Sequence, residues 1–480
     1  MKQTDWKIIY NNYKGISKKA VNLLSKEAGR FLIRDEMEYS IYILPCEKEG
    51  CEVSKNAFFI SLYNESPMIQ KYVKREEVPE GGFAVKIIKN PNDEEGFYVF
   101  LTAWDEKELF YSVVSFLDDY MPRHAPNDSA NYMIGETFDY PLYEYTYSEV
   151  PDHKIRSIFT WGHSINNFRE YIDNMARVKL NEVIIWNDYV PINIDEIVEY
   201  AHSYGISVVL GYSWGWREIG NKVMEITDET IENLKKLVID TYRDVYAPLK
   251  CDGIYFQSFT ERKEDRVGDK LISELVSEMV NDIAAELWKI TPNLRLIFGL
   301  HATSVRKHLP AIAKVDPKIE ILWEDCGQFP FDYSSRVKSE EEYEKTLEFV
   351  KEILELRGGK GVGFAFKGVM MLDWTKKVGQ HGPYVMGENA PYIADHDRRL
   401  RALGWKVISA NWVSNGPAAH RMMQWIKENE LSDTTLCTAG TFDGGIYLPF
   451  ALSAEMFRNC NAPYDQILNR VARRWCIRVD

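Results

Sequence analysis

The most regular feature of this sequence is an alternation of short apolar runs with longer amphipathic segments, which begins near Ile155. The short runs have the length and composition of buried strands, and the longer segments, such as Ile194–Tyr204 and Leu271–Ile290, have helical periodicity. We expect strands at Ser157–Gly162, Glu182–Asn187, Ser207–Tyr212, Gly253–Gln257, Arg295–Leu300, Ile319–Trp323, Gly361–Lys367 and Lys406–Asn411.

This alternation predicts an α/β fold with a closed (β/α)8 barrel, because parallel strands separated by helices are covered on both faces. Eight such units over about 270 residues match the usual size of the barrel. An open, doubly wound sheet is the alternative. Neither G-x-G-x-x-G nor G-x-x-x-x-G-K-[ST] follows any strand, which removes the nucleotide-binding reason for an open sheet.

The length of 480 residues is too great for one ordinary core, and we expect three parts. Residues 1–150 form a small α/β domain, 151–430 the barrel, and 431–480 a C-terminal extension of a loop and helices. The first part contains a polar linker at Pro122–Asn131. Its expected helices and strands are Lys18–Leu32, Tyr39–Pro45, Gly82–Ile88, Tyr98–Thr102 and Asp105–Tyr120, and those of the last part are the helices Pro449–Phe457 and Tyr464–Trp475.

Charge and composition exclude several classes of function. A net charge of −14 argues against nucleic acid as a partner, because phosphates require a basic surface. The N-terminal residues lack the apolar segment of a secretory signal, and no apolar run is long enough to span a membrane, so we expect a cytoplasmic protein. The seven cysteines are scattered without a C-x-x-C pair, which favours reduced thiols over disulfides or a zinc site.

The residues that follow the predicted strands are unusually rich in tryptophan and in polar side chains. In a (β/α)8 barrel the C-terminal strand ends build the active site. Seven of the 13 Trp residues fall at these ends. The candidate site residues are Trp161, His163, Trp186, Asn187, Asp188, Trp214, Trp216, Gln257, Glu261, His301, Trp323, Glu324, Asp325, Lys367, Asp373, Trp374, Asn411 and Trp412.

This set of residue types suits a sugar. Trp rings stack on the apolar face of a pyranose, and amides, carboxylates and imidazoles bond its hydroxyls. Hydrolysis of a glycosidic bond needs two carboxyl groups, one protonated and one ionised. We therefore expect a sugar-binding wall of tryptophans, with carboxylate chemistry beside it. The wall comprises Trp161, Trp186, Trp214, Trp323, Trp374 and Trp412.

Glu261 is the preferred general acid, because it follows an uncharged run and Phe259 at the end of strand four, where partial burial would raise the pKa of a carboxyl. The alternative is a surface ion pair with a neighbouring cation. Glu324 or Asp325 is the preferred second carboxylate, and only one of them can point into the site because side chains alternate along a strand. The competing carboxylates are Asp373 and Asp188.

The remaining polar candidates have two interpretations each. His163 and His301 either bind substrate hydroxyls or are ordinary rim histidines, and Lys367 either complements an anionic substrate or pairs with a carboxylate. No H-x-H or H-E-x-x-H spacing is present, so we expect neither a metal nor a cofactor.

The layout and two segments resemble known glycoside hydrolases. Arg156–Trp161 opens strand one, and Tyr171–Asn181 carries helix one into an Asn before strand two. Together with the small domain before the barrel, these segments look like the β-hexosaminidase-type enzymes, whose layout the α-glucuronidases and α-N-acetylglucosaminidases share. The resemblance covers about Lys18 to Asn415 in layout.

The resemblance implies that Glu261 is the acid, and one position departs from the pattern. True β-hexosaminidases have an Asp directly before the acid, to orient the acetamido group of the substrate, whereas this chain has Thr260. A similarity to α-glucuronidases would make Asp325 or Asp373 the base, and a similarity to α-N-acetylglucosaminidases would make Glu324 the nucleophile.

The sequence therefore predicts an exo-acting glycosidase that removes a terminal sugar from a small glycoside or oligosaccharide. The Trp-rich rim is also compatible with a homo-oligomer in which a neighbour's loop closes over it. A non-catalytic sugar-binding protein on a glycosidase barrel is the rival interpretation, and a sugar lyase or isomerase, which usually needs a metal or a Lys base, is the third.

Overall fold

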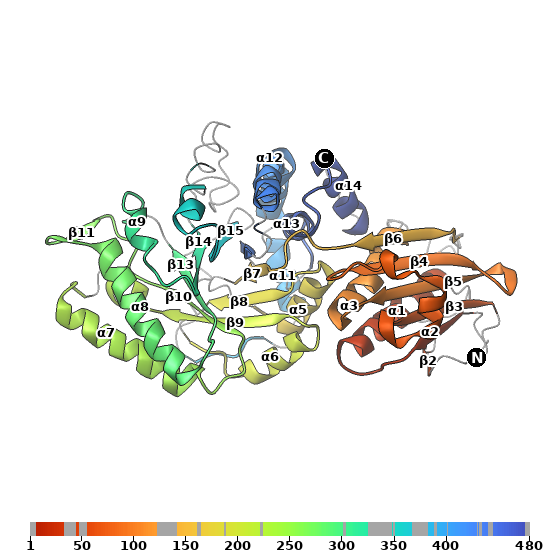
Figure 1. The fold of residues 1–480 in the computed structure, drawn as a ribbon, viewed down its shortest axis with the longest axis horizontal. Coiled ribbons are helices and arrows are strands. Elements are labelled where there is room, and N and C mark those ends of the chain that lie inside the picture. The colour runs from red at the N-terminus through yellow and green to blue at the C-terminus, as the bar shows by residue number, and fades with distance from the viewer. Residues whose placement is uncertain are drawn as a thin grey trace. The chain divides into compact units, whose positions relative to one another are not determined.

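The computed structural model describes most of the chain, which divides into two compact units, each described here by itself (Figure 1). The first unit comprises residues 1–151, 203–205 and 465–479, and the second comprises nearly all of the rest. The described residues are 6–32, 45–47, 55–121, 142–160, 165–186, 189–220, 224–300, 304–324, 348, 351–366, 383–387, 391–400, 402–429, 431, 434–439 and 445–475.

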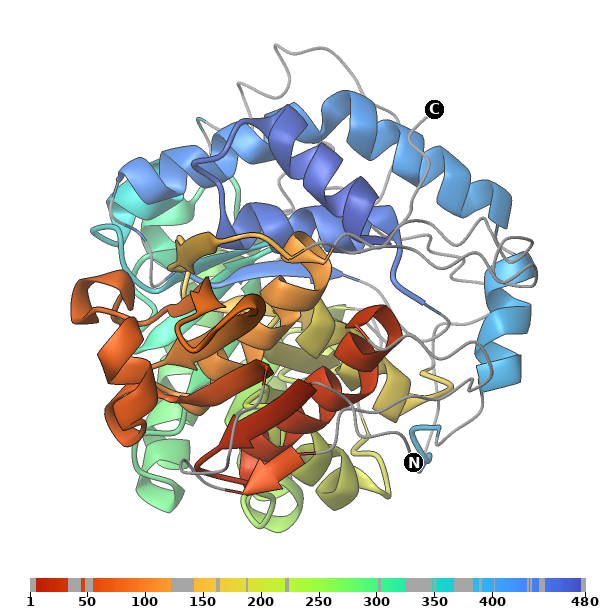
Figure 2. The ribbon, with the colours of Figure 1, turned by 90° about the vertical axis from the view of Figure 1, so that its right-hand side faces the viewer.

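The first unit is built on a six-stranded mixed sheet, drawn in red to orange in Figure 2, with the strand order β2-β1-β3-β5-β4-β6. β1, β2, β3 and β5 run parallel, whereas β4 is antiparallel to β5 and β6. The strands are β1 (Trp6–Tyr10), β2 (Pro45–Glu47), β3 (Asn56–Leu62), β4 (Phe83–Asn90), β5 (Asp93–Ala103) and β6 (Tyr145–Glu149). The helices are α1 (Gly15–Leu32), η1 (Tyr63–Glu65), α2 (Pro67–Tyr72), η2 (Arg75–Glu77), α3 (Glu106–Ser115), η3 (Phe116–Tyr120) and α14 (Tyr464–Trp475).

Both faces of this sheet are covered. α1 and α3 pack against each other, and both contact strands of the sheet. A second apolar cluster joins Ile9, Phe59 and Phe100 of the strands to Ile69 of α2. The chain returns to this unit at its C-terminal end, where Arg474 of α14 binds both carboxylate oxygens of Asp119 at 2.6 and 2.9 Å.

The expected helices and strands of this part are confirmed where the structure describes them. They correspond to α1, β4, β5, and α3 with η3. Strand β2 contains only Pro45 of the expected run Tyr39–Pro45, whose other residues lie outside the described part, as does the expected linker Pro122–Asn131. Strands β1, β3 and β6 and helix α2 were not expected from the sequence.

The second unit is a closed barrel of eight parallel strands, as the sequence predicted. Its order β7-β8-β9-β10-β13-β14-β15-β16 follows the chain, and β16 pairs with β7 to close it. The strands are β7 (Arg156–Phe159), β8 (Glu182–Trp186), β9 (Ser207–Ser213), β10 (Gly253–Gln257), β13 (Leu296–Leu300), β14 (Ile319–Trp323), β15 (Val362–Phe366) and β16 (Leu436–Ala439).

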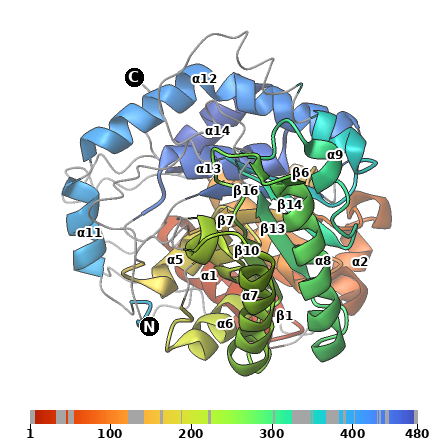
Figure 3. The ribbon, with the colours of Figure 1, turned by 90° about the vertical axis from the view of Figure 1, so that its left-hand side faces the viewer.

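Helices surround these strands (Figure 3). Within the described residues, no helix is both long enough and apolar enough to cross a bilayer. A short hairpin, β11 (Arg266–Val267) and β12 (Lys270–Leu271), precedes α8. The helices are α5 (Phe168–Arg177), α6 (Ile194–His202), η4 (Trp216–Gly220), α7 (Asp228–Thr241), η5 (Tyr242–Tyr246), α8 (Ile272–Ile290), α9 (Leu309–Ile312), α11 (Pro391–Leu400), α12 (Ala402–Glu428) and α13 (Leu448–Arg458).

Seven of the eight expected barrel strands are confirmed, and the eighth is wrong. The expected strand Lys406–Asn411 lies inside α12, and β16 closes the barrel instead, within the segment where we expected only a loop and helices. The buried residues of α12 recur at intervals of three and four, which is the period of a helix, and not at the interval of two that a strand requires.

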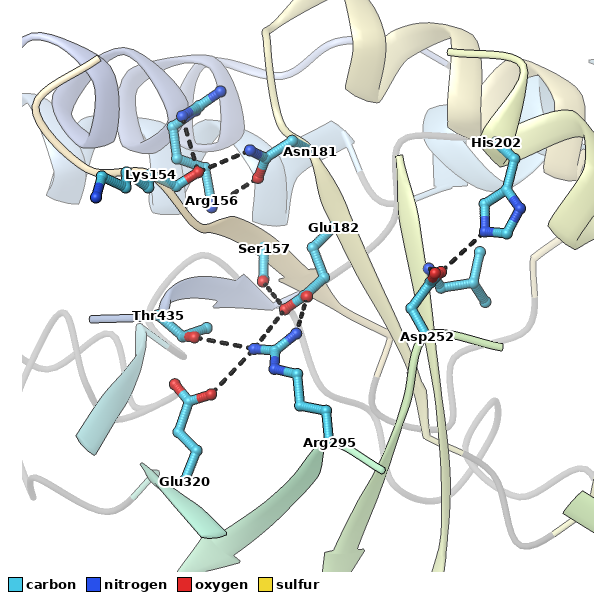
Figure 4. Close-up of polar contacts among 11 residues, drawn as sticks. Lys154, Arg156, Ser157, Asn181, Glu182, His202, Asp252, Arg295, Glu320 and Thr435 are labelled. Carbon is cyan, nitrogen blue, oxygen red and sulfur yellow. Dashed lines mark hydrogen bonds and ion pairs between the residues drawn. The ribbon is translucent and has the colours of Figure 1, made fainter. Parts of the chain in front are cut away.

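The N-terminal end of the barrel interior is filled by a charged network (Figure 4). Arg295, just before β13, pairs with Glu182 of β8 and, at 3.0 Å, with Glu320 of β14. Ser157 of β7 donates to Glu182 at 2.6 Å, and Arg295 donates to Thr435 at 3.2 Å. Burial alone would lower the pKa of Arg295, but the two carboxylates raise it, so the guanidinium stays charged. We assign this network to the stability of the barrel, because barrel active sites lie at the opposite, C-terminal end of the strands.

Candidate active site

The inner surface near the C-terminal end of the barrel is shaped by two glycines. A side chain at Gly211 of β9 would overlap the ring of Trp186, and one at Gly299 of β13 would overlap the hydroxyl of Tyr255. Since side chains alternate along a strand, Tyr255 and Gln257 of β10 face the same way, into the space that the two glycines leave open.

Glu324 occupies that space. It follows β14 directly, is fully buried, and accepts a hydrogen bond from the hydroxyl of Tyr255. The amide of Gln257 lies 3.1 and 3.2 Å from its two carboxylate oxygens and 2.7 Å from the Tyr255 hydroxyl. A buried carboxylate is costly unless donors satisfy it, and here two donors converge on one carboxyl group.

Tyr255 donates its phenolic hydrogen to Glu324. Burial, and then the neighbouring carboxylate of Glu324, raise the pKa of its phenol well above the ordinary value. The hydroxyl therefore keeps its proton throughout the physiological pH range.

Glu261 lies in the loop after β10 and is exposed, in contrast to the partial burial that we expected. Its Oε2 accepts a hydrogen bond of 2.8 Å from the indole N–H of Trp216 in η4. The preceding residues Phe259 and Thr260 are fully buried, so the loop is packed against the barrel as far as the residue before Glu261.

Aromatic rings connect the two carboxyl groups. The rings of Trp216 and Trp186 pack edge to face with their centroids 6.3 Å apart. The rings of Trp186 and Tyr255 pack in the same way with their centroids 5.1 Å apart. Trp186 is 6% exposed, and Trp216 is half-buried. A continuous path thus runs from Glu261 through Trp216, Trp186 and Tyr255 to Glu324.

Two other predicted wall residues lie outside the barrel interior. Trp214 is fully buried, and its ring stacks on that of Phe256 with the centroids 3.6 Å apart. Phe256 lies between the inward-facing Tyr255 and Gln257 on β10, so it faces outward. Trp323 is also fully buried, and it directly precedes the inward-facing Glu324, so its ring faces the surrounding helices.

The expected placement of Asn411 and Trp412 at the end of the eighth strand is wrong. Both residues lie on α12, where Trp412 is fully buried and its carbonyl accepts a hydrogen bond from the hydroxyl of Tyr464 at 2.5 Å. The error follows from the misassigned strand Lys406–Asn411.

Half of the predicted site residues fall in segments that the structure does not describe. They are Trp161, His163, Asn187, Asp188, His301, Asp325, Lys367, Asp373 and Trp374. Among the residues that are described, no group of three or more His, Cys, Asp or Glu side chains could hold a metal ion.

Three polar residues of the site region were not among those predicted from the sequence: Tyr255, Ser213 and Glu218. Tyr255 lies in the middle of a strand, and our search covered only strand ends. Ser213 ends β9 and donates to Glu218 of η4 at 2.7 Å. The signal for Tyr255 was its spacing of two from Gln257, together with glycines inside two neighbouring strands, which indicate close approach of a side chain.

Comparisons with known proteins place the fold. No family model matches the chain, and no similar sequence was found among curated proteins. A solved structure of CpGH84B matches 98% of this chain and 71% of its own length, with a TM-score of 0.51 and 12% identity. CpGH84D matches 76% of this chain and 57% of its own at a TM-score of 0.45 and 14% identity.

A third similar structure is BtGH115A, a family GH115 4-O-methyl-α-glucuronidase with specificity for decorated arabinogalactans. It matches 98% of this chain and 57% of its own length, with a TM-score of 0.49 and 12% identity. At these identities the similarity concerns the fold alone. Only CpGH84B, with its TM-score of 0.51, is used to support it. The expected (β/α)8 barrel, preceded by a small α/β part, is confirmed, and its fold is similar to that of CpGH84B.

Proposed function

We propose that this protein is an exo-acting glycoside hydrolase, which removes a terminal sugar from a small glycoside or oligosaccharide with Glu261 and Glu324 as its two carboxyl groups. The observation that carries the proposal is the path of contacts between them. Two carboxyl groups, each held by its own donors, are joined by Trp rings at the C-terminal ends of barrel strands.

Glu324 is assigned the ionised role. Its two donors, the Tyr255 hydroxyl and the Gln257 amide, favour a carboxylate over a carboxylic acid, which would itself need an acceptor. An ionised carboxylate beneath the sugar acts either as the nucleophile of a retaining enzyme or as the base of an inverting one.

Glu261 is assigned the acid. Oε2 of Glu261 accepts the hydrogen bond from the indole N–H of Trp216. The acidic proton would therefore be on Oε1 and would pass to the oxygen of the leaving group. Its exposure suits this position, since a leaving group must depart toward solvent. The half-buried Trp216 beside it supplies the apolar surface on which a pyranose ring stacks.

The first test is hydrolysis of aryl glycosides in both anomers, covering N-acetylglucosaminide, N-acetylgalactosaminide, glucuronide, glucoside and galactoside. The wild type is compared with Glu324→Gln and Glu261→Gln, and the matched control is Glu278→Gln on the exposed side of α8. We expect one sugar to be released, with a loss of about three orders of magnitude or more in Glu324→Gln and none in the control.

Two results would contradict the proposal. Equal turnover in all four proteins would remove both carboxyl groups from the mechanism. Absence of turnover across the panel, with retained binding of one sugar by wild type and Glu324→Gln alike, would favour a sugar-binding protein on this barrel.

A further inference from the structure

The last residue of β9, Ser213, makes three hydrogen bonds through one hydroxyl. The hydroxyl donates a hydrogen bond to Oε2 of Glu218 at 2.7 Å. It accepts hydrogen bonds from the backbone N–H groups of Gly215 at 3.2 Å and Arg217 at 3.0 Å. One donated and two accepted bonds use the full capacity of a serine hydroxyl. Ser213 is 8% exposed and lies two residues after Gly211 on the same strand, so both face the barrel interior.

These bonds fix the turn that carries Trp216. Gly215 and Arg217, the residues on either side of Trp216, are the two whose N–H groups Ser213 accepts. Gly215 has a φ of +109°, and a Cβ there would approach Phe259 to 2.9 Å, so the backbone packs closely on the β10 loop. Trp216 then begins a π-helical turn, a local geometry that recurs at functional sites.

The indole of Trp216 reaches Glu261 from this turn. The hydrogen bonds of the Ser213 hydroxyl go to Glu218, Gly215 and Arg217, and not to Glu261 or Glu324. Their influence on the reaction passes through the backbone on both sides of Trp216, and from its indole N–H to the carboxylate of Glu261.

We infer that Ser213 and Glu218 form a clasp, a positioning pair that holds the indole of Trp216 on Glu261 and thereby orients the acid carboxyl group. The inference rests on the proposed function for its catalytic consequence, but the geometry of the clasp can be measured without turnover. Loss of the serine hydroxyl removes the acceptor of two backbone N–H groups and the donor to Glu218 in one step, so the turn is held only by its backbone bonds and loosens. A displacement of about 1 Å at a reacting group is enough to cost about 100-fold in rate.

The structural test is the ¹⁵N–¹H spectrum of the indole groups in tryptophan-labelled full-length protein. Trp216→Phe identifies the Trp216 resonance, and Glu261→Ala shows how far it moves when the acceptor is removed. We expect Ser213→Ala to move this resonance in the same direction, and Ser213→Thr, which keeps a hydroxyl, to leave it near the wild-type position. Ser207→Ala, at the other end of β9, is the control and should not move it.

The kinetic test is a double-mutant cycle between Ser213 and Trp216. We expect Ser213→Ala to lower kcat/KM by about 10- to 100-fold, Ser213→Thr to recover most of that loss, and Ser213→Ala to cost nothing further in a Trp216→Phe background. Glu218→Ala removes only the acceptor of the serine hydroxyl and leaves the two backbone N–H bonds in place, so it should lower kcat/KM less than Ser213→Ala does. A thermal melt of each variant verifies that it is folded.

The outcomes separate the clasp from the proposed function. An unmoved Trp216 resonance in Ser213→Ala, or losses that multiply in the double variant, would overturn the clasp. Absence of turnover in the wild type would overturn the proposed function, and the indole spectrum would still decide whether Ser213 holds Trp216.

Discussion

At the scale of single residues, the candidate site contains a phenol, Tyr255, whose pKa is raised well above its ordinary value. Burial and the neighbouring Glu324 raise the pKa of Tyr255, so its hydroxyl keeps its proton and donates to that carboxyl group throughout the physiological pH range. A hydrogen bond to a charged group contributes about 1.5–3 kcal/mol, which is large enough to be measured in kinetics.

Replacing Tyr255 by Phe removes this donor and leaves the ring. We expect kcat/KM to fall by about 10- to 100-fold, because the ionised Glu324 loses one of its donors. Tyr242→Phe is the matched control, since Tyr242 is also buried but its hydroxyl donates to Thr291, the residue after α8. Full activity in Tyr255→Phe would contradict the role of Glu324 as the ionised group.

At the scale of secondary-structure elements, glycines inside strands make room for the site. Gly299 is the clearest case, because a Cβ there would overlap the Tyr255 hydroxyl and approach Oε1 of Glu324 to 2.5 Å. Gly253 of β10 offers a milder comparison, with a nearest contact of 3.1 Å to the carbonyl oxygen of Arg295.

Gly299→Ala should therefore separate Tyr255 from Glu324. We expect loss of most activity and a thermal midpoint lower than that of Gly253→Ala, because overpacking a fully enclosed position costs about 1–3 kcal/mol. Melting curves and kcat/KM of the two variants are the measurement. A Gly299→Ala protein as active and as stable as wild type would mean that the two side chains are not held together there.

The strands of the barrel were largely predictable from the sequence, and one comparison shows why the last was not. The expected strands at Gly253–Gln257 and Ile319–Trp323 have the observed bounds of β10 and β14, because each is a short apolar run fully enclosed by turns and helices. The run Lys406–Asn411 also contains short apolar stretches, but it continues the helical period of α12 through Trp412 and Met423. β16 is only four residues long, too short for its pattern to be distinctive.

The candidate site was predictable to the extent that it follows strand ends. Glu324 and Glu261 were found in this way. The facing of each side chain was the weaker step, as Trp323 shows: it precedes an inward-facing residue, and so it must face outward. The clasp of Ser213 and Glu218 required the π-helical turn at Trp216–Gly220, a geometry for which the sequence has no periodic signal.

At the scale of the whole molecule, buried histidines set how stability depends on pH. His153 is fully buried, and burial lowers its pKa from 6.5 to about 4. Burial also lowers the pKa of His420. Both residues are therefore neutral in the folded protein under conditions where an unfolded chain begins to take up protons.

Because the unfolded state binds the proton of His153 more tightly, its contribution is fully present above pH 6.5 and is lost as the pH falls toward 4. Between pH 7.5 and pH 5 this residue alone should lower the free energy of unfolding by about 2 kcal/mol. Urea denaturation at the two pH values measures the difference in wild type, in His153→Gln, and in His202→Gln as the exposed control. Equal losses in wild type and His153→Gln would exclude this histidine as a source of the acid sensitivity.

The central claim is that Glu261 and Glu324 divide the work of glycoside cleavage. The most direct measurement is kcat/KM of Glu261→Gln and Glu324→Gln on two aryl glycosides of the accepted sugar, one with a phenol and one with a dinitrophenol leaving group. Dinitrophenolate departs without a proton, so Glu261→Gln should lose about 100-fold or more on the phenyl glycoside and little on the dinitrophenyl one, whereas Glu324→Gln should lose activity on both. Equal losses by Glu261→Gln on the two substrates, or retained activity in Glu324→Gln, would contradict this account.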